Sequence, residues 1–539
     1  MTNRKHNHPS NKIEIQEAPI FYRFPFIKVN VIDDVEQIDF RLSGHFTVED
    51  LNGKCAFDSL TGEARWRVAV EASAPSQFGY GISIHEYYDM ESAKAVARRL
   101  QERGFEPKIQ TFGYQWRFGD KREINNSTYR VYLEGFSTIH EARQLQRKLF
   151  DFQQSTIFKY RAREGHGIME MFDVNYSKSI KCGGPIKLTP RERSSSISFL
   201  KIRNNTDVME FPDLYDVQFR INDKGKLQCV AEMDIEAYVG GLITAQYQEN
   251  YPDSYLEALS ITIRSWVAAN WGRLHKGEAY QFCSSDHCFY LAGLQPWPRR
   301  VMEVMKKTKG QVLTCGDEIC NTPSHLVCGG HTESLENVGD FESKPYLKSL
   351  FDTEGHRTPE KMPDSLNNEE AIEIWINNQP RVNCNLSEKK DMEDFRKFRR
   401  FFRWEVEYTR QELEEIISQK TEEDIGTLYD IVPLKRGTSG RLVETEILGS
   451  RQNVKLVGDL AIREAFSQTQ LPSSCFIVRA RMDEHGIPTL FNFVGAGNGD
   501  GVGMCQLGAI SKAYSGQTAQ DIITHYFGEG IQLEKLPLT

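Results

Sequence analysis

Hydrophobic and polar positions alternate along the first part of the chain, from Phe21 to about Val70. The segments FIKVNVID, VEQIDFRLSG, HFTVEDL and ARWRVAVEA place apolar side chains at every second position, with glycine and aspartate between the runs. This period of two is typical of short β-strands with one buried face. Residues 166–237 show the same style. We therefore expect strands in an N-terminal β segment, 21–77, and again over 166–237.

An internal repeat lies between these two β regions. Apolar residues alternate over 82–84 and again over 131–133, and an amphipathic helix pattern follows each, over 93–100 and 142–149. A candidate strand comes after each helix, PKIQTF and then STIFKY. The unit is βαβ twice, the pattern of a small ferredoxin-like sandwich. Chance similarity of two amphipathic segments is the alternative.

This repeat, about 78–162, resembles a SPOR domain, a family that binds peptidoglycan glycan strands stripped of their peptides. The resemblance implies that the sheet carries the sugar. Aromatic faces suit the C–H surfaces of sugars, although most buried aromatic side chains simply fill a core. The aromatic candidates of the repeat are Tyr87, Tyr88, Tyr114, Trp116, Tyr132 and Phe136.

Helical and polar patterns follow the second β region. Apolar residues from Leu256 to Val267 share one face, which predicts a helix from Ser254, with Pro252 just before it where proline is tolerated. Residues 353–400 are polar and include the charged run EKKDMEDFRKFRR, which favours a solvated surface insertion. A β-rich ending closes on a glycine-dense loop and a helix over 519–526.

Composition fits a soluble globular chain of two or three domains. The 539 residues are 39% hydrophobic and 26% charged, and no run approaches the roughly 18 apolar residues of a membrane span. The 66 basic and 75 acidic side chains leave a net charge of −9, which is unfavourable for general nucleic-acid binding. Residues 1–20 are polar and are expected to form a disordered tail without the apolar stretch of a secretory signal.

The eleven cysteines are too sparse for a disulfide scaffold, but some of them cluster with histidines. Cys283, His287 and Cys288 lie close together, with His275 a short distance upstream. Zinc prefers thiolate and imidazole ligands, and four of them close a structural tetrahedron. A disulfide or small buried thiols are the alternatives.

Two further segments carry candidate chemistry. The first runs from His325 through Cys328-Gly329-Gly330 to His331-Thr332-Glu333-Ser334, where paired glycines can bring the backbone close to a ligand. A tight turn with capping residues is an equal alternative. The second, over 495–504, has too many glycines for a helix and suggests a bulged loop near a ligand. It is not a dinucleotide fingerprint, because no βαβ unit surrounds it.

In order and spacing, these segments resemble the SpoIID/LytB family, named for stage II sporulation protein D and amidase enhancers. The similarity runs over about 200–539, and the SPOR-like unit would be an insertion. The matching positions are Tyr238-Val239-x-Gly241, Pro252, Arg264-Ser265-Trp266, Cys283, His287, Cys288, Gly310-Gln311-Val312-Leu313, Cys328-Gly329-Gly330-x-Thr332-Glu333, Pro345-Tyr346-Leu347, Ser439-Gly440-Arg441 and Gly501-Val502-Gly503-Met504-x-Gln506-x-Gly508-Ala509.

The resemblance implies an extracytoplasmic cell-wall protein with zinc in the Cys/His cluster. The sporulation members are lytic transglycosylases. One glutamate protonates the glycosidic oxygen, and the 6-hydroxyl of the sugar then closes a 1,6-anhydro ring. The resemblance also implies the glycan-contacting positions, which are His325, Gly329, Gly330, Thr332, Glu333, Gly501, Gly503, Gln506, Tyr87 and Phe136.

The chain differs from the family at two ionisable positions, the catalytic glutamate and a histidine of the glycine loop. Counted from Pro252 and Arg264, the catalytic glutamate falls on Gln246, whose amide has no acidic proton to transfer. The family's glycine-loop histidine is replaced by Asp500. Glu249 could substitute if it lies on the same helix face as Gln246, although a solvated carboxylate is the simpler interpretation. Asp500 could be an acid if burial raised its pKa.

The predicted fold class is α+β. It combines a SpoIID-like mixed domain rich in short strands, over 21–77 and 163–539, with a small ferredoxin-like SPOR-like domain over 78–162. The leading hypothesis is a protein that binds denuded glycan strands with reduced or absent activity. The alternatives are an active lytic transglycosylase that uses Glu249 or Asp500, with Arg264 among the catalytic positions, and an activator of a cell-wall amidase.

Two points stay open at this level. The polar start conflicts with an extracytoplasmic location, and we expect that it is not the start of the exported precursor. Unconventional export and a chain that stays inside the cell are the alternatives. If the chain is exported, a disulfide between Cys328 and Cys384 is a further hypothesis, and two free thiols would refute it.

Overall fold

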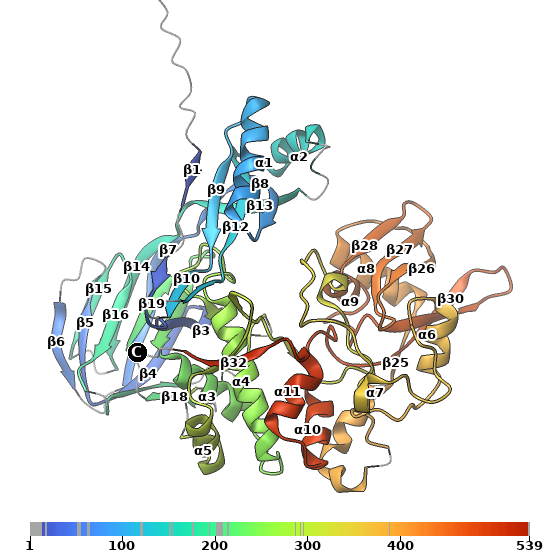
Figure 1. Cartoon of the computed structure of the whole chain (residues 1–539). Helices are drawn as coiled ribbons and strands as arrows, with labels where there is room; N and C mark the ends of the chain where they lie inside the picture. The colour runs from blue at the N-terminus through green and yellow to red at the C-terminus, as the bar shows by residue number, and fades with distance from the viewer. Residues whose placement is uncertain are drawn as a thin grey trace, which may run out of the picture.

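The computed structural model describes residues 13–536 apart from short gaps, and its elements group into four parts (Figure 1). Of the predicted disordered tail, residues 1–20, residues 1–12 and 17–18 lie outside the described residues. The rest contains strand β1 and the start of β2, so the prediction of disorder is wrong there. The gaps are residues 17–18, 51–54, 62–64, 119–121, 150–151, 153–154, 175–176, 193, 201–207, 213–214, 286, 292, 295 and 388.

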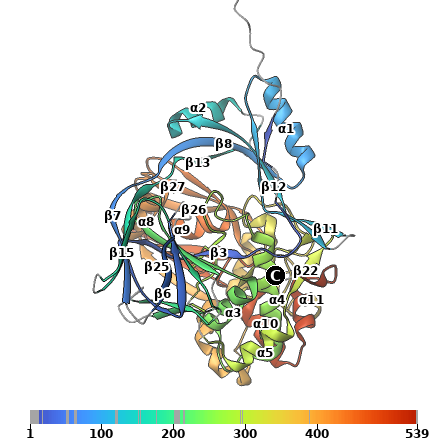
Figure 2. The same cartoon turned by 90° about the vertical axis from the view of Figure 1, so that its left-hand side faces the viewer.

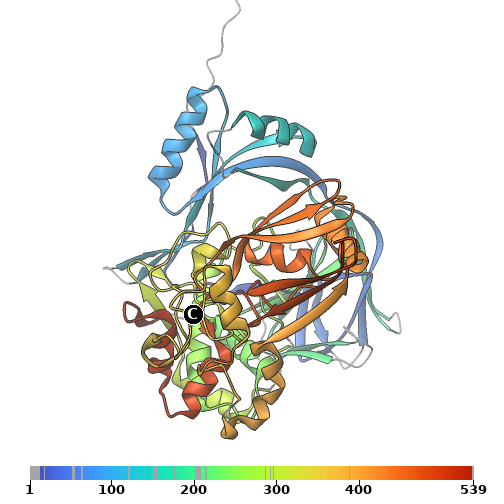
Figure 3. The same ribbon diagram turned by 90° about the vertical axis from the view of Figure 1, so that its right-hand side faces the viewer.

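A small α/β unit stands at the top of Figure 1. Its five strands follow the order β1-β9-β12-β8-β13, and β12 pairs antiparallel with both β8 and β9. Helices α1 and α2 cover the outer face, where Ile82, Ala97 and Val131 are buried, so that the other face of the sheet points towards the rest of the molecule (Figures 2 and 3). The bounds are β1 Glu14–Ile15, β8 Gln77–Tyr87, α1 Met90–Glu102, β9 Lys108–Phe112, β12 Thr128–Phe136, α2 Ile139–Lys148 and β13 Thr156–Arg163.

The strands and helices of the internal repeat therefore lie where the sequence predicts them, in the chain order β-α-β-β-α-β. Each helix begins at a polar cap, because the side chains of Asp89 and Thr138 accept hydrogen bonds from the backbone N–H groups of Ser92 and Glu141. The assignment of this unit as a SPOR domain stays a prediction.

A hairpin leaves this unit and enters the main core. It pairs with β2 in a three-stranded sheet, and the Tyr114 hydroxyl donates a hydrogen bond to the Ala268 carbonyl over 2.6 Å. Tyr114 and Trp116 are fully buried there, so these two aromatic candidates fill the core, which was the alternative to sugar contact. The bounds are β2 Ile20–Phe21, β10 Gln115–Phe118 and β11 Arg122–Asn125.

Two β-sheets pack face to face in the second part, at the left of Figure 1. Their orders are β15-β14-β7-β4-β17-β18 and β21-β3-β20-β19-β16-β5-β6. Phe40 of one sheet stacks on Phe219 of the other with ring centroids 5.3 Å apart. The strands are β3 Ile27–Val35, β4 Gln37–Ser43, β5 His45–Glu49, β6 Cys55–Thr61, β7 Arg65–Ala74, β14 His166–Asp173, β15 Ser179–Cys182, β16 Ile186–Pro190, β17 Ser196–Leu200, β18 Val208–Pro212, β19 Asp216–Ile221, β20 Leu227–Met233 and β21 Phe282–Cys283.

A helical layer forms the centre of the molecule. Helix α4 begins after Pro252, as predicted, and is buried on nearly all sides by α3, α5 and α11. Short strands pair beside it in the orders β23-β22-β32 and β24-β31. The bounds are α3 Ile235–Gln246, α4 Asp253–Asn270, α5 Arg299–Lys307, β22 Gln311–Cys315, β23 Glu318–Ile319, β24 Ser324–His325, β31 Met504–Cys505, α10 Gln506–Tyr514, α11 Ala519–Phe527 and β32 Gln532–Lys535.

The fourth part, at the right of Figure 1, has a core of its own. Trp404, Phe476 and Phe493 pack between two three-stranded sheets, β25-β30-β29 and β26-β27-β28, and helices α8 and α9. The bounds are β25 Trp404–Thr409, α8 Arg410–Thr421, β26 Leu428–Arg436, β27 Leu442–Gly449, β28 Val454–Val457, α9 Asp459–Ala465, β29 Phe476–Met482 and β30 Pro488–Gly495.

The polar segment 353–400 differs from its prediction as a solvated insertion. Trp375, Cys384 and Phe395 are at most 1% exposed and belong to the main core. Most charged side chains of this segment are exposed, but several apolar side chains between them pack into the main core, so a count of polar residues missed the contact. The elements here and just before are η1 Leu335–Asn337, η2 Glu354–His356, α6 Glu369–Ile376, η3 Lys390–Phe398 and α7 Arg399–Phe402.

Candidate functional site

The four predicted zinc ligands meet at the end of the helical layer. Cys283 ends β21, which is held in place by parallel pairing with β3, and His275 lies in the loop after α4. One ligand atom of each of His275, Cys283, His287 and Cys288 lies within 4.8 Å of all the others. The Cys288 sulfur lies 3.3 Å from His275 Nε2 and 3.4 Å from His287 Nδ1.

These distances fit a metal tetrahedron. Zinc bonds of roughly 2.05 Å to nitrogen and 2.3 Å to sulfur at the tetrahedral angle put the two ligand atoms about 3.5 Å apart. A hydrogen bond with Cys288, followed by bonds with both histidines, lowers the pKa of the Cys283 thiol. The cluster can therefore hold a metal, and its four ligands would leave no open position for substrate.

Gln246, which the resemblance aligns with the family's catalytic glutamate, is the last residue of α3. Its side-chain amide donates to the Leu242 carbonyl over 3.2 Å, one helical turn back. Glu249 follows in the exposed turn before α4, where its backbone carbonyl accepts a bond from Arg300. Because α3 has ended, Glu249 does not share a helix face with Gln246, which was the basis for its proposed substitution.

Arg264 lies inside the helical layer and is 0% exposed. Its guanidinium bonds both carboxylate oxygens of Glu236, at 2.7 and 2.8 Å, and the carbonyls of Ser260 and Gln311. These contacts hold α3 against α4. A catalytic role for Arg264 stays a prediction.

The glycine loop wraps around buried side chains. A Cβ on Gly501 would lie 2.3 Å from Cζ of Arg441, and the positive φ of 85° is itself unfavourable for other residues. Among the residues that the structure describes, His325 Nε2 has no hydrogen-bond partner, whereas its Nδ1 donates to the Val502 carbonyl over 3.0 Å. The glycine at 501 thus lets the backbone pack closely against another side chain of the protein, that of Arg441.

Asp500 lies in the same loop. Its Oδ1 accepts a bond from the Val502 N–H over 3.0 Å. Burial, followed by the nearby Asp459 charge, raises the pKa of the Asp500 carboxyl. Within the described residues, no hydrogen bond or ion pair joins Asp500 to Gln246.

Glu333 is the centre of a buried polar network. Its carboxylate is 0% exposed and accepts from the Ser334 N–H at 2.8 Å, the Asn337 amide at 2.9 Å and the Ser439 hydroxyl at 2.6 Å. Its backbone N–H donates to the Gly501 carbonyl over 2.9 Å. The network joins the Cys-Gly-Gly segment to the glycine loop.

The other predicted glycan-contacting positions of these two segments lie in the same surroundings. Gln506 is half-buried and donates to the Ser324 hydroxyl over 3.4 Å. Gly329, Gly330, Thr332 and Gly503 are buried. These residues are in contact with other parts of the protein, and sugar contact by them stays a prediction.

A cleft of about 660 Å³ separates the small α/β unit from the helical layer. Tyr87 lines this cleft and Phe136 does not, although both rings also pack against the core beneath the helices. Sugar contact by either ring stays a prediction. Two cations cover the Tyr88 ring, Lys344 at 4.5 Å and Arg273 at 5.7 Å from its centroid. The remaining polar lining includes Glu86, Asp89, Asn270, Glu318, Asn321, Asp340 and Glu342, and the remaining aromatic lining includes Phe341 and Tyr346.

The sequence analysis missed this cleft because its two walls lie far apart in the chain. The one local signal was the pair Tyr87-Tyr88, placed just before α1. The opposite wall comes from the C-terminal end of α4 and from segments near Glu318 and Lys344, whose spacing carries no motif.

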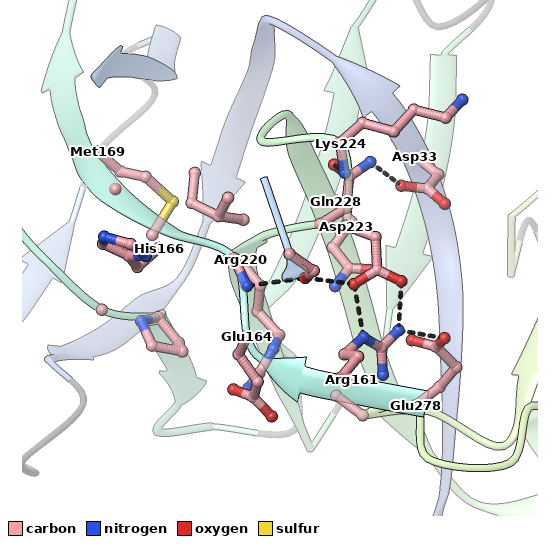
Figure 4. Close-up of a pocket in the computed structure, with 18 of the residues that line it drawn as sticks. Asp33, Arg161, Glu164, His166, Met169, Arg220, Asp223, Lys224, Gln228 and Glu278 are labelled. Atoms are coloured by element: carbon pink, nitrogen blue, oxygen red, sulfur yellow. Dashed lines mark hydrogen bonds and ion pairs between the residues drawn. The ribbon is translucent and has the colours of Figure 1, made fainter. Parts of the chain in front are cut away.

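A second cavity, of about 580 Å³, opens between β13, β14 and the turn before β20 (Figure 4). Arg161 stands between Asp223 and Glu278 and bonds both. The Ser76 hydroxyl also donates to Asp223, over 2.6 Å. Because these central charged groups bond one another, we interpret the cavity as a structural contact between the segments around Arg161, Asp223 and Glu278.

Two family models match parts of the chain. Residues 223–315 match the family described as Stage II sporulation protein (SpoIID), and residues 333–503 match a domain of unknown function, DUF8618. The first match spans Gln246, Arg264 and the Cys/His cluster. It supports membership of the SpoIID family and indicates a cell-wall-related function.

No curated protein matches the chain. Within the described part of the chain, no helix is long and apolar enough to cross a membrane.

Proposed function

We propose that this protein binds the glycan strands of peptidoglycan outside the cytoplasm and does not cleave them. The observation that carries the proposal is the cleft between the small α/β unit and the helical layer. Its aromatic rings can lie against sugar C–H faces, while its amides and carboxylates can bond hydroxyl and acetamido groups. The SPOR-like resemblance of one wall supports this proposal, as does the SpoIID match, which covers the part of the other wall near Asn270 and Arg273.

Binding is tested with purified denuded glycan strands and the full chain. Phe341 lines the cleft and is 52% exposed, so Phe341→Ala removes a ring that sugar could cover. Tyr429 is 47% exposed on β26, away from the cleft, and Tyr429→Ala is the matched control. We expect Phe341→Ala to weaken glycan sedimentation by about tenfold, since one aromatic contact contributes roughly 1–1.5 kcal/mol. Equal binding by both variants would contradict the proposal.

The absence of cleavage follows from Gln246. A general acid must carry a transferable proton, and a neutral amide does not supply one. We expect wild type to release no 1,6-anhydro-ended fragments from denuded glycan. Gln246→Glu restores the family's residue and should gain this product, while Gln246→Asn should not.

A second candidate function, a lytic transglycosylase that uses Asp500, has one observation in its favour. Burial raises the pKa of that carboxyl, as a general acid requires. If wild type cleaves glycan and Asp500→Asn does not, this second candidate is correct. If wild type binds glycan and stimulates an added cell-wall amidase, the protein acts as an activator.

Zinc in the His275, Cys283, His287 and Cys288 cluster is part of the proposal. With four protein ligands the ion would supply structural stability rather than a polarised water. It would tie the loop after α4 to the β-sheet through β21.

A further inference from the structure

Four side chains from distant parts of the chain meet inside the protein, away from the Cys/His cluster. They are Cys328 in the loop after β24, Asp352 beyond η1, Cys384 between α6 and η3, and Cys505 at the end of β31. One ligand atom of each lies within 4.8 Å of all the others. All four residues are at most 2% exposed, so water cannot solvate their charges.

The distances differ from those of a disulfide. The sulfurs of Cys328 and Cys384 are 3.4 Å apart, whereas a disulfide bond is about 2.05 Å. The hypothesis of a bond between these two cysteines is therefore wrong for this structure. A zinc tetrahedron with bonds of roughly 2.3 Å to sulfur and 2.0 Å to oxygen puts two sulfurs about 3.8 Å apart and a sulfur and an oxygen about 3.5 Å apart. The Cys328 sulfur lies 3.5 Å from Asp352 Oδ2.

A second layer of contacts orients the carboxylate. Oδ1 of Asp352 accepts bonds from the Tyr526 hydroxyl at 2.9 Å and the Asn383 amide at 3.0 Å, and it lies 3.2 Å from His525 Nε2. Oδ2 remains directed at the Cys328 sulfur. Outer hydrogen bonds of this kind fix the ligating oxygen in metal sites.

Backbone amides do the same for two of the sulfurs. The N–H of Gly330 donates to the Cys328 sulfur over 3.3 Å, and the N–H groups of Cys328 and Gly508 donate to the Cys505 sulfur over 3.3 and 3.4 Å. Such bonds stabilise sulfur as an anion, which is the form that binds a metal. Buried anionic groups require a cation at their centre or they stay protonated.

We propose that Cys328, Asp352, Cys384 and Cys505 form a second, closed metal site for a thiophilic divalent cation of the zinc class. Three soft thiolates select such ions, and four protein ligands leave no position for substrate. Binding exchanges the thiol protons for the metal ion, so no oxidant or reductant is needed.

The site would anchor the segment that matches DUF8618. Cys328 and Cys505 flank residues 333–503, and Asp352 and Cys384 lie within them. One ion would therefore join both ends of this segment to its interior and fasten it beside α10, which begins directly after Cys505.

The first test counts metal in the full-length chain, purified with reductant and excess zinc and then freed of unbound ion. We expect about two zinc ions per wild-type chain, and about one in Cys384→Ser. His287→Ala, which removes a ligand of the other cluster, is the matched control and should also hold about one, while the double variant holds none. Unchanged zinc in Cys384→Ser, with His287→Ala already reduced, would overturn the proposal.

A second test needs no substitution. Wild type is alkylated before and after chelation, and the modified cysteines are identified by mass spectrometry. We expect Cys328, Cys384 and Cys505 to become reactive together on chelation, because each loses its metal bond. Buried Cys229, which belongs to neither metal-binding cluster, is the internal control, and its reactivity should change little on chelation. A Cys328–Cys384 disulfide in the untreated protein, or reactivity that does not depend on chelator, would contradict the metal site even if the Cys384 variant failed to fold.

Discussion

Replacing Arg264 with methionine should loosen helices α3 and α4 far more than the loss of a surface ion pair does. The side chain is 0% exposed, and its partner Glu236 is 16% exposed. Methionine fills much of the same volume but leaves the Glu236 carboxylate inside the protein without its cation. Removal of one partner of a buried pair costs about 3–5 kcal/mol, and a tenfold change corresponds to about 1.36 kcal/mol. Amide hydrogens of α3 and α4 should therefore exchange roughly 150- to 5,000-fold faster.

Hydrogen exchange read by mass spectrometry is the suitable assay, because it reports each helix separately in a chain of several parts. The control is Glu303→Gln on α5, which breaks an exposed pair of 2.9 Å with Arg299 and should cost about 0.5 kcal/mol or less. Arg264→Met combined with Glu236→Met should recover part of the loss, since no charge is then left unpaired. If Arg264→Met changes exchange no more than Glu303→Gln does, the structural role assigned to this arginine is wrong.

Three further predictions concern the glycine loop and its neighbours, all read from unfolding midpoints. Gly501→Ala should cost about 1–3 kcal/mol more than Gly516→Ala, because both have a φ near +85° but only the Cβ at 501 meets Arg441, while nothing lies within 4 Å at 516. Burial raises the pKa of the Asp500 carboxyl, so the folded chain holds the proton of this carboxyl more tightly than the unfolded chain does. The folded chain therefore loses stability as the pH rises from about 4, and Asp500→Asn should become more stable relative to wild type between pH 4 and 7. Burial lowers the pKa of His331 to about 4, so the stability that the neutral imidazole contributes is lost as the pH falls from about 6.5 to 4. His331→Gln should therefore make the unfolding midpoint less dependent on pH in this range.

Local patterns predicted local elements well. Helix α4 begins within one residue of its predicted start because Pro252 cannot continue a helix backwards and the apolar face is regular. The two βα repeats also lie at their predicted positions. The pairing of β4 with β17 and of β3 with β20 was out of reach, since partners more than a hundred residues apart leave no trace in a single sequence.

The same distinction separates the two cysteine clusters. His275 and Cys288 are thirteen residues apart, so their cluster is visible as a spacing. Cys328 and Cys505 are separated by 177 residues and meet only because the intervening chain folds back on itself. The burial of Glu333 and Arg264 could not be predicted from the sequence either. Both are residue types that act in catalysis, yet in the structure their side chains bond protein donors or acceptors.

The central claim is that this chain holds glycan and has lost the family's acid. The most direct measurement incubates wild type and Gln246→Glu with denuded glycan strands, then assays sedimentation and 1,6-anhydro-ended fragments by mass spectrometry. We predict that wild type binds without releasing fragments and that Gln246→Glu both binds and cleaves. Fragments released by wild type, or no binding by either protein, would contradict the account.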